Sequence, residues 1–193
     1  MLGGVILHID ELKNELAIRC KNGLPFLLSA TVIWSIVLVI FLLPYEIEGK
    51  NILTLYSTSI MFPLSILCSK IIRADWRAND NPLGILGLYI NLAQLMYFPI
   101  LAYMFYKNPN EMIVFLAVIT GAHLFPYGWF YNAKAYTIMA PVISILISLI
   151  GWNISVAGLW LIPLSMILLL IILNIWLYIN YKIKLQGINK DRV

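Results

Sequence analysis

The distribution of charged residues constrains this chain more than any other feature. Six long apolar segments carry no Asp, Glu, Lys or Arg away from their ends, and together they use most of the 193 residues. A helix needs about 20 mostly apolar residues to cross a hydrocarbon core of roughly 30 Å. With 62% hydrophobic and only 11% charged residues, the chain is expected to have a lipid bilayer as its solvent.

The predicted fold is all-α: a polytopic bundle of six membrane-spanning helices preceded by an amphipathic helix. The division is an N-terminal helix (1–24), a membrane domain (25–181) and a basic tail (182–193). The spans are predicted at 25–43, 52–72, 83–106, 112–131, 135–150 and 156–181. Because the fifth is short and the sixth long, we expect one of them to be tilted or broken. A five-span interpretation stays open.

The basic residues predict the orientation. All of the 13 Lys and Arg residues except Lys50 and Lys107 fall in segments on one side of this topology. Short cytoplasmic loops carry an excess of positive charge, so both termini are expected in the cytoplasm. The net charge of +4 thus reflects anchors at the membrane interface, and no nucleic-acid partner is expected.

Apolar residues recur every three or four positions in the N-terminal segment, which predicts an amphipathic helix. They are Val5, Ile9, Leu12, Leu16 and Cys20. Its acidic and basic residues balance, unlike those of helices that bind anionic lipid. Packing beneath the bundle, or against a second copy, is therefore at least as consistent with the sequence as binding among headgroups. Gly23 is expected to end this helix, and Pro25 to begin the first span.

A polar loop precedes the third span. A turn that caps this span is predicted from Asn79, Asp80, Asn81 and Pro82. The loop also holds the one polar cluster at headgroup depth, formed by Asp75, Trp76, Arg77, Asn79 and Asp80. A lipid-modifying enzyme would need such a cluster, but a capped and solvated loop explains the same residues.

Prolines lie inside the second to sixth spans, where each removes a backbone hydrogen bond and can kink its helix. They are Pro63, Pro99, Pro126, Pro141 and Pro163, and the first three follow a Phe. Breaks at corresponding places in two halves would indicate a transporter built from inverted repeats. However, proline is ordinary in membrane helices, and the two halves do not align convincingly.

The polar residues within spans 3 and 4 form the candidate site. His123 lies about eleven residues into its span, or roughly 17 Å at 1.5 Å per residue, and Thr120 and Tyr127 share its helical face. In the third span, Asn91 and Gln94 lie on one stripe, with Gln94 at a similar depth. The small residues of span 4, namely Ala117, Gly121 and Gly128, form a separate surface on which another helix can pack closely.

Two interpretations of these side chains remain open. In the first, Asn91, Gln94 and His123 are hydrogen-bonding groups that hold helices together, each worth about 0.6 kcal/mol. In the second, they form with Thr120 and Tyr127 a binding site for a polar solute. Ser144, Ser148 and Asn174 are weaker candidates, because single hydroxyls and amides commonly bond within membrane bundles.

No catalytic residues, metal ligands or cofactors are assigned. All carboxylates lie outside the deep parts of the spans, which argues against carriers that use a buried acid, voltage sensors and intramembrane aspartyl proteases. The His-Glu-x-x-His and Gly-x-Ser-x-Gly motifs are also missing from the sequence.

Several segments resemble a family of small bacterial multi-pass membrane proteins of unknown function. They are Gly23-Leu-Pro-Phe, Asn81-Pro-Leu-Gly, Asn91-Leu-Ala-Gln, the stretch 121–136 and Met139-Ala-Pro-Val-Ile-Ser. The resemblance implies a bacterial plasma membrane but no activity and no site residues. From the residues themselves, the leading hypothesis is a small-solute permease or solute-binding bundle that forms a homo-oligomer. The alternative is an accessory or regulatory subunit of another membrane protein.

Overall fold

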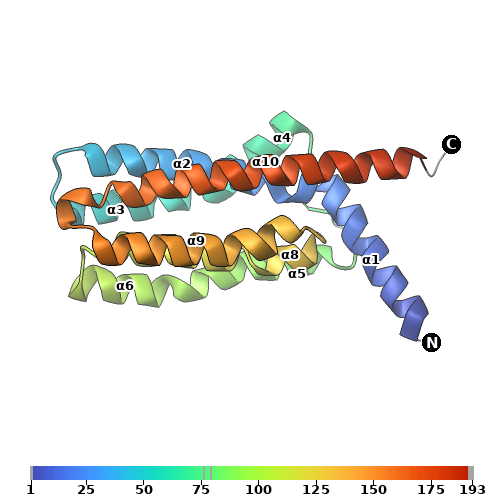
Figure 1. Cartoon of the computed structure of the whole chain (residues 1–193), viewed down its shortest axis with the longest axis horizontal. Helices are drawn as coiled ribbons and strands as arrows, with labels where there is room; N and C mark the ends of the chain where they lie inside the picture. Colours follow the sequence, from blue (N-terminus) through green and yellow to red (C-terminus); the bar gives the residue numbers. More distant parts are fainter. Residues whose placement is uncertain (1, 76, 79, 191–193) are drawn as a thin grey trace.

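The six predicted spans form one elongated helical bundle, with both termini at the same end (Figure 1). The structure is a computed structural model that describes residues 2–75, 77, 78 and 80–190, with the backbone alone at 2–8 and 188–190. Every regular element within these residues is a helix. The all-α prediction is therefore confirmed, whereas the side of the membrane on which the termini lie stays a prediction.

The helices follow the predicted spans closely. Their bounds are α1 Leu2–Arg19, η1 Lys21–Gly23, α2 Leu24–Leu42, α3 Ile47–Ser59, α4 Met61–Ile72, α5 Gly84–Ala93, η2 Gln94–Tyr97, α6 Phe98–Lys107, α7 Met112–His123, α8 Pro126–Phe130, α9 Lys134–Asn153, η3 Val156–Gly158 and α10 Leu161–Lys190. Five of the resulting helical segments in the described residues are long and apolar enough to cross a membrane, and there are six if α3 and α4, which meet at a bend of 45°, count as one span. The last helix continues past Tyr181 to Lys190 without a break.

Spans 2, 3 and 4 each have a backbone irregularity next to a Phe-Pro pair. Span 2 bends between Ser59 and Met61, just before Pro63. Span 3 passes through the short 3₁₀ helix η2 just before Pro99. Span 4 is interrupted between α7 and α8, directly before Pro126. The proline ring clashes with the carbonyl four residues earlier and lacks the N–H that would bond to it.

The predicted sixth span is irregular only near its start, where two turn residues separate the 3₁₀ helix η3 from α10. Both α9 and α10 are continuous, although α9 contains Pro141. The length difference that prompted the expectation of a tilted or broken span persists, because α9 has 20 residues and α10 has 30.

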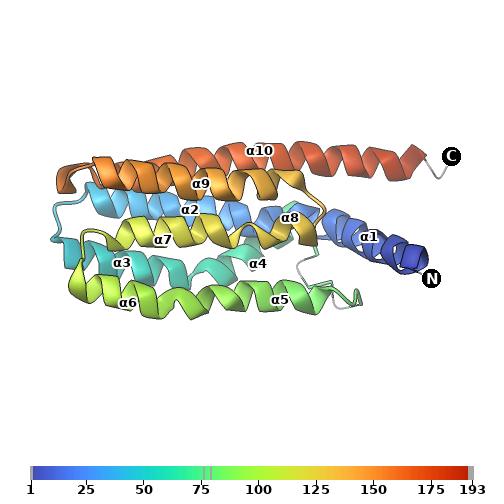
Figure 2. The same cartoon turned by 60° about the horizontal axis from the view of Figure 1, so that its bottom comes forward.

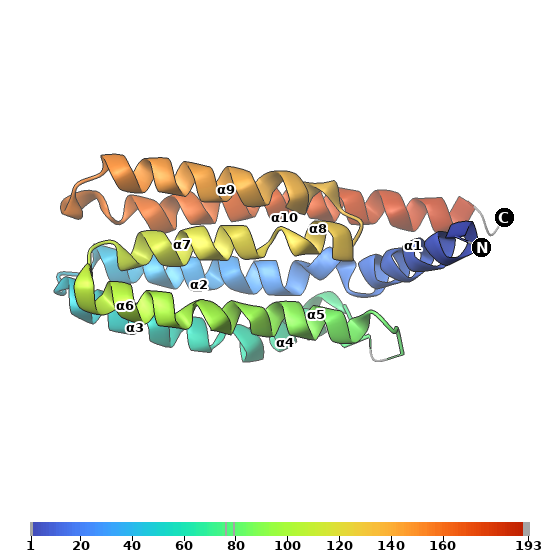
Figure 3. The same cartoon turned by 90° about the horizontal axis from the view of Figure 1, so that it is seen from below.

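The core of the bundle lies among α2, α7, α9 and α10. Helix α10 packs against α2 and α9, and α7 packs against α9 (Figures 2 and 3). The predicted small-residue surface of span 4 accounts for this last pair. A Cβ at Gly121 of α7 would lie 2.7 Å from Ile143 Cγ2, and one at Gly128, in the following helix α8, would collide with Thr137 Oγ1 of α9. Only glycine allows α9 to approach so closely.

Span 3, formed by α5, η2 and α6, lies at the edge of the bundle (Figure 3). It packs mainly against α7, which confirms that spans 3 and 4 are neighbours. Only 6% of its most apolar window is buried, against 56% for span 1. A cavity lined by residues of spans 1, 2 and 3 lies on the inner side of this span.

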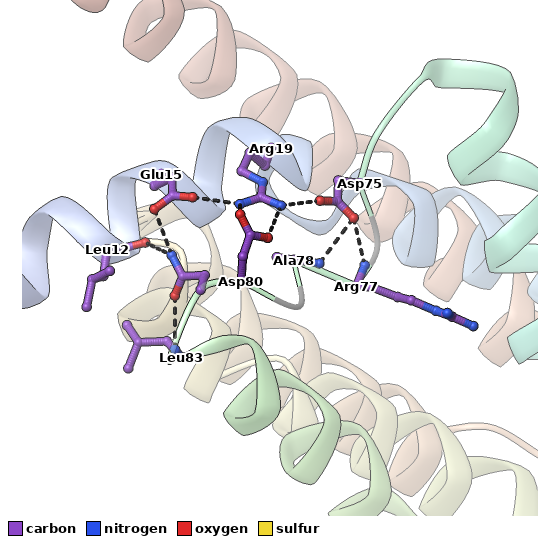
Figure 4. A network of polar contacts seen from close by, with 9 residues as sticks. Leu12, Glu15, Arg19, Asp75, Arg77, Ala78, Asp80 and Leu83 are labelled. Atoms are coloured by element: carbon purple, nitrogen blue, oxygen red, sulfur yellow. Dashed lines mark hydrogen bonds and ion pairs between the residues drawn. The ribbon is translucent and has the colours of Figure 1, made fainter.

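The N-terminal helix docks at the end of the bundle through both apolar and charged contacts. Leu16, Ala17 and Cys20 are buried. Arg19 bonds with Glu15 of its own helix and with Asp75 and Asp80 of the loop between spans 2 and 3 (Figure 4). These contacts bear out the prediction that the N-terminal helix packs against the bundle.

The polar loop before span 3 is held to α1 and is not merely solvated. Asn81 Nδ2 donates to Leu12 O and to Glu15 Oε2, both at 3.1 Å, and Asn81 Oδ1 accepts from the Leu83 N–H (Figure 4). Asn81 thus forms the predicted turn before α5, although the helix itself begins at Gly84. Trp76 and Asn79, which the sequence placed in this loop, lie outside the described residues.

Candidate functional site

The five candidate residues from spans 3 and 4 line one cavity. It has a volume of about 70 Å³, and its walls include Asn91, Gln94, Thr120, His123 and Tyr127. The other walls include residues of α2, Met61 at the bend in span 2, Leu170 of α10, and the aromatic residues Tyr131 and Tyr136. The structure therefore brings together every residue that the sequence assigned to the site.

A second and larger chamber adjoins the first. Its volume is about 410 Å³, within the range of pockets that hold small-molecule ligands. The two chambers share Phe26, Ala30, Met61, Asn91, Gln94 and Thr120. The larger one extends away from His123, and Trp34, Val37 and Leu101 are among its walls. Tyr97 also lines it, although its side chain is 41% exposed.

The hydrogen bonds separate the candidate residues into two groups. Asn91 Nδ2 donates to Gly87 O at 2.9 Å, and Thr120 Oγ1 donates to Leu116 O at 2.8 Å, each within its own helix. In the described part of the chain, the side chains of Gln94, His123 and Tyr127 have no hydrogen-bond partner. His123 instead contacts the Tyr127 ring edge-on, with 5.6 Å between centroids.

This arrangement differs from interhelical hydrogen bonding. Side-chain hydrogen bonds that join two helices occur elsewhere in the bundle. Asn174 Nδ2 of α10, for example, donates to Thr31 Oγ1 of α2 at 3.1 Å. Ser144 reaches Val118 O of α7 at 3.3 Å, and Ser148 bonds within α9. None of these three weaker candidates lines the two chambers.

The irregular parts of three spans converge on the cavity. The bend of span 2 contributes Ser59 and Met61, the 3₁₀ turn of span 3 contributes Gln94, and the interruption of span 4 contributes His123 and Leu124. Irregular backbone within the depth of a membrane is tolerated where protein buries it or where it lines a cavity. The Phe-Pro pairs thus position the walls of the site.

Aromatic side chains close the small chamber at the end that carries the termini. Tyr127, Tyr131 and Tyr136 lie within 5.7 to 6.2 Å of one another by ring centroids. The Tyr136 hydroxyl donates to Asn22 O at 2.7 Å. The backbone at Gly23 has a φ of +76°, and a Cβ there would lie 2.8 Å from Tyr131 Cε2.

A lysine that the sequence did not single out fixes this closure. Lys184 Nζ donates to the carbonyls of Tyr131 and Asn132 at 2.6 and 3.0 Å. These carbonyls follow α8, so the ammonium group compensates the negative end of that helix. Asn22, in turn, donates to Leu177 O and to Asn180 Oδ1. Such contacts join residues more than 50 positions apart, and local periodicity carries no signal for them.

The cavity carries no ionic group. No Asp, Glu, Lys or Arg is among the described residues that line either chamber. No group of three metal-ligating side chains occurs in the described ranges either. The site offers hydrogen bonds from an amide, an imidazole and a phenol at one end, and apolar walls over most of the rest.

A third cavity of about 300 Å³ lies near the opposite end of the bundle. Glu46, Lys50 and Trp160 are among its walls. Lys50 Nζ donates to Phe41 O at 3.1 Å, close to the end of α2. Because this lysine compensates exposed carbonyls there, its position has a structural explanation.

The family comparison covers nearly the whole chain. The model of DUF7010, described as a family of unknown function, matches residues 9–180. No curated protein and no solved structure matches the chain.

Proposed function

We propose that this chain, which belongs to the DUF7010 family, binds a small solute in the cavity beside spans 3 and 4. It acts in a bacterial plasma membrane, as a permease or as a solute-binding bundle. The observation that carries the proposal is the convergence of three interrupted spans on one cavity. Interrupted helices that meet near mid-membrane are typical of transporter binding sites.

The unpaired polar groups support binding over a purely structural role. In hydrocarbon, a polar group without a partner costs several kcal/mol. Gln94 and His123 face a cavity but bond to no other described residue. A solute or water that enters the cavity would satisfy them, whereas helix packing alone does not.

The edge position of span 3 supports movement of the solute. This span packs mainly on α7 and is otherwise little buried. A small displacement of span 3 would change the opening of the cavity without disrupting the α2, α9 and α10 core. The N-terminal helix binds the loop that begins span 3 through Arg19, so we propose that it holds this wall in place.

An accessory subunit is the second candidate function. It is favoured by the segment of α1 that projects beyond the bundle (Figure 1). However, the C-terminal half of α1 binds this chain itself. A stoichiometric protein partner recovered in mild detergent would favour the accessory function.

Uptake by proteoliposomes over a panel of neutral, cationic and anionic solutes tests the permease. His123→Leu removes the imidazole and is expected to abolish uptake while the protein still assembles. His123→Gln keeps a hydrogen-bond donor and an acceptor, so this variant is expected to retain part of the uptake. Ser148→Ala is the matched control, because Ser148 bonds only within α9.

Equal uptake by wild type and His123→Leu for every solute would contradict transport through this cavity. Loss of folded protein in His123→Leu, with His123→Gln behaving like wild type, would instead assign the imidazole a structural role.

A further inference from the structure

The two chambers differ in size, and His123 and Tyr127 line only the smaller one. The small chamber has a volume of about 70 Å³, room for a few water molecules at about 10–15 Å³ each. The larger chamber of about 410 Å³ is walled mainly by aliphatic and aromatic side chains.

The polar end offers hydrogen bonds but no charge. Asn91 and Thr120 already donate within their own helices, whereas the Gln94 amide, the His123 imidazole and the Tyr127 hydroxyl have no hydrogen-bond partner among the described residues. An amide and an imidazole can each donate and accept. They suit a single hydroxyl or carbonyl group, which needs one or two such bonds.

The missing ionic partners exclude charged ligands. A charge within the membrane is costly unless an opposite charge or several dipoles compensate it. Neither chamber has an acidic or basic side chain among its described walls. A sugar or other polyol is equally disfavoured, because the larger chamber would leave most of its hydroxyls without partners.

We propose that the ligand is a neutral amphiphile, an apolar body that ends in one hydroxyl or carbonyl group, bound with this group at Gln94 and His123. The body extends past Trp34 towards Val37 and Leu101. This inference rests on the proposed function, since it names the class of solute that the same cavity binds.

Trp34 provides a reporter for the test. It is only 4% exposed and lines the larger chamber. A dibrominated stearyl alcohol that occupies the chamber will quench its fluorescence. The chain has six Trp residues, so the Trp34 contribution is taken as the difference between wild type and Trp34→Phe, both in phosphatidylcholine nanodiscs.

The alcohol is compared with the dibrominated stearic acid and stearylamine. We expect saturable quenching of Trp34 by the alcohol, and more than about tenfold weaker quenching by the two charged probes. Gln94→Leu and His123→Phe should each weaken binding of the alcohol about threefold to tenfold. Ser148→Ala should leave it unchanged.

Acrylamide, a small neutral aqueous quencher, separates failure of this inference from failure of the proposed function. Quenching of Trp34 by acrylamide but by none of the long-chain probes would overturn the amphiphile and leave a cavity for a small polar solute. If a charged probe binds as tightly as the alcohol, the ligand need not be neutral, but binding of an amphiphile in this cavity stands. If neither acrylamide nor any long-chain probe reaches Trp34, both proposals fail.

Discussion

The guanidinium group of Arg19 lies 2.6 Å from the carboxylate of Asp75, and this contact ties the N-terminal helix to the loop that leads into span 3. A second 2.6 Å contact joins Arg19 to Asp80 of the same loop. The residue at the end of α1 therefore sets where the least buried span begins. Because span 3 forms one wall of the cavity, the position of α1 is linked to the geometry of the site.

Replacing Arg19 should loosen this docking without unfolding the bundle. In Arg19→Gln the three carboxylates lose their shared cation, so amide hydrogen exchange in α1 and in the loop 73–83 should become faster. Arg19→Lys keeps the charge but loses the forked geometry and should give an intermediate result. Unchanged exchange in α1 would show that apolar contacts alone hold the helix.

Acid should release α1 through the same residues. Burial acts to raise the pKa of Asp75, but hydrogen bonds from the Ala78 N–H, the Arg19 guanidinium and the Arg77 N–H outweigh it and hold the pKa below its usual 3.8. The stabilisation is thus complete above pH 3.8 and is lost as the pH falls through the lower pKa of the folded protein.

Cleavage of α1 by pepsin along a pH series measures this transition. Wild type is expected to become sensitive only below pH 3.8, and Arg19→Gln should already be sensitive above that pH. Identical profiles for the two proteins would show that the contact between Arg19 and Asp75 does not hold α1 in place.

Gly23 should be irreplaceable at the closed end of the cavity. Gly23→Ala places a Cβ 2.8 Å from Tyr131 Cε2 at a φ of +76°, so we expect a loss of about 1–2 kcal/mol in the free energy of unfolding. Gly187→Ala is the control, because nothing lies within 4 Å of a Cβ there. Denaturation in mixed micelles measures both, and a Gly23→Ala variant as stable as this control would contradict the packing.

Tyr136→Phe should weaken the same closure by removing one hydrogen bond. The hydroxyl donates to Asn22 O at 2.7 Å, and its loss leaves that carbonyl without this donor, at a cost of about 1 kcal/mol. Tyr178→Phe, at an exposed position of α10, should have no effect on thermal unfolding in detergent. A similar small effect of both changes would show that the Asn22 contact adds nothing.

The sequence predicted the spans because long apolar segments with charges at their ends have few alternatives in a bilayer. It also placed Gln94 and His123 at one depth, since helical rise converts residue number into distance. The bend in span 2 was not predicted, because proline is common in membrane helices and only packing decides which one interrupts its helix. Arg19, Asn22 and Lys184 were not identified as contacts, because each meets residues distant in sequence.

The second interpretation of the polar residues, a solute site in place of interhelical bonds, depends on whether solutes reach the cavity. Thr120 lines both chambers, whereas Ala122, two residues along α7, is exposed on the outer surface and lines neither. These two positions lie at nearly equal depth, about 3 Å apart along the helix, and therefore make a matched pair.

The most direct measurement is the reaction of N-ethylmaleimide with Thr120→Cys and with Ala122→Cys in lipid. Both variants are made in a background where the free Cys20 and Cys68 are replaced by Ala. A thiol that faces hydrocarbon stays protonated and unreactive, so the account predicts reaction at position 120 at least about tenfold faster than at 122. Ala30 lines both chambers, so Ala30→Phe fills part of their space and should slow the reaction at position 120. Equally slow reaction at both positions would contradict a solute-accessible cavity.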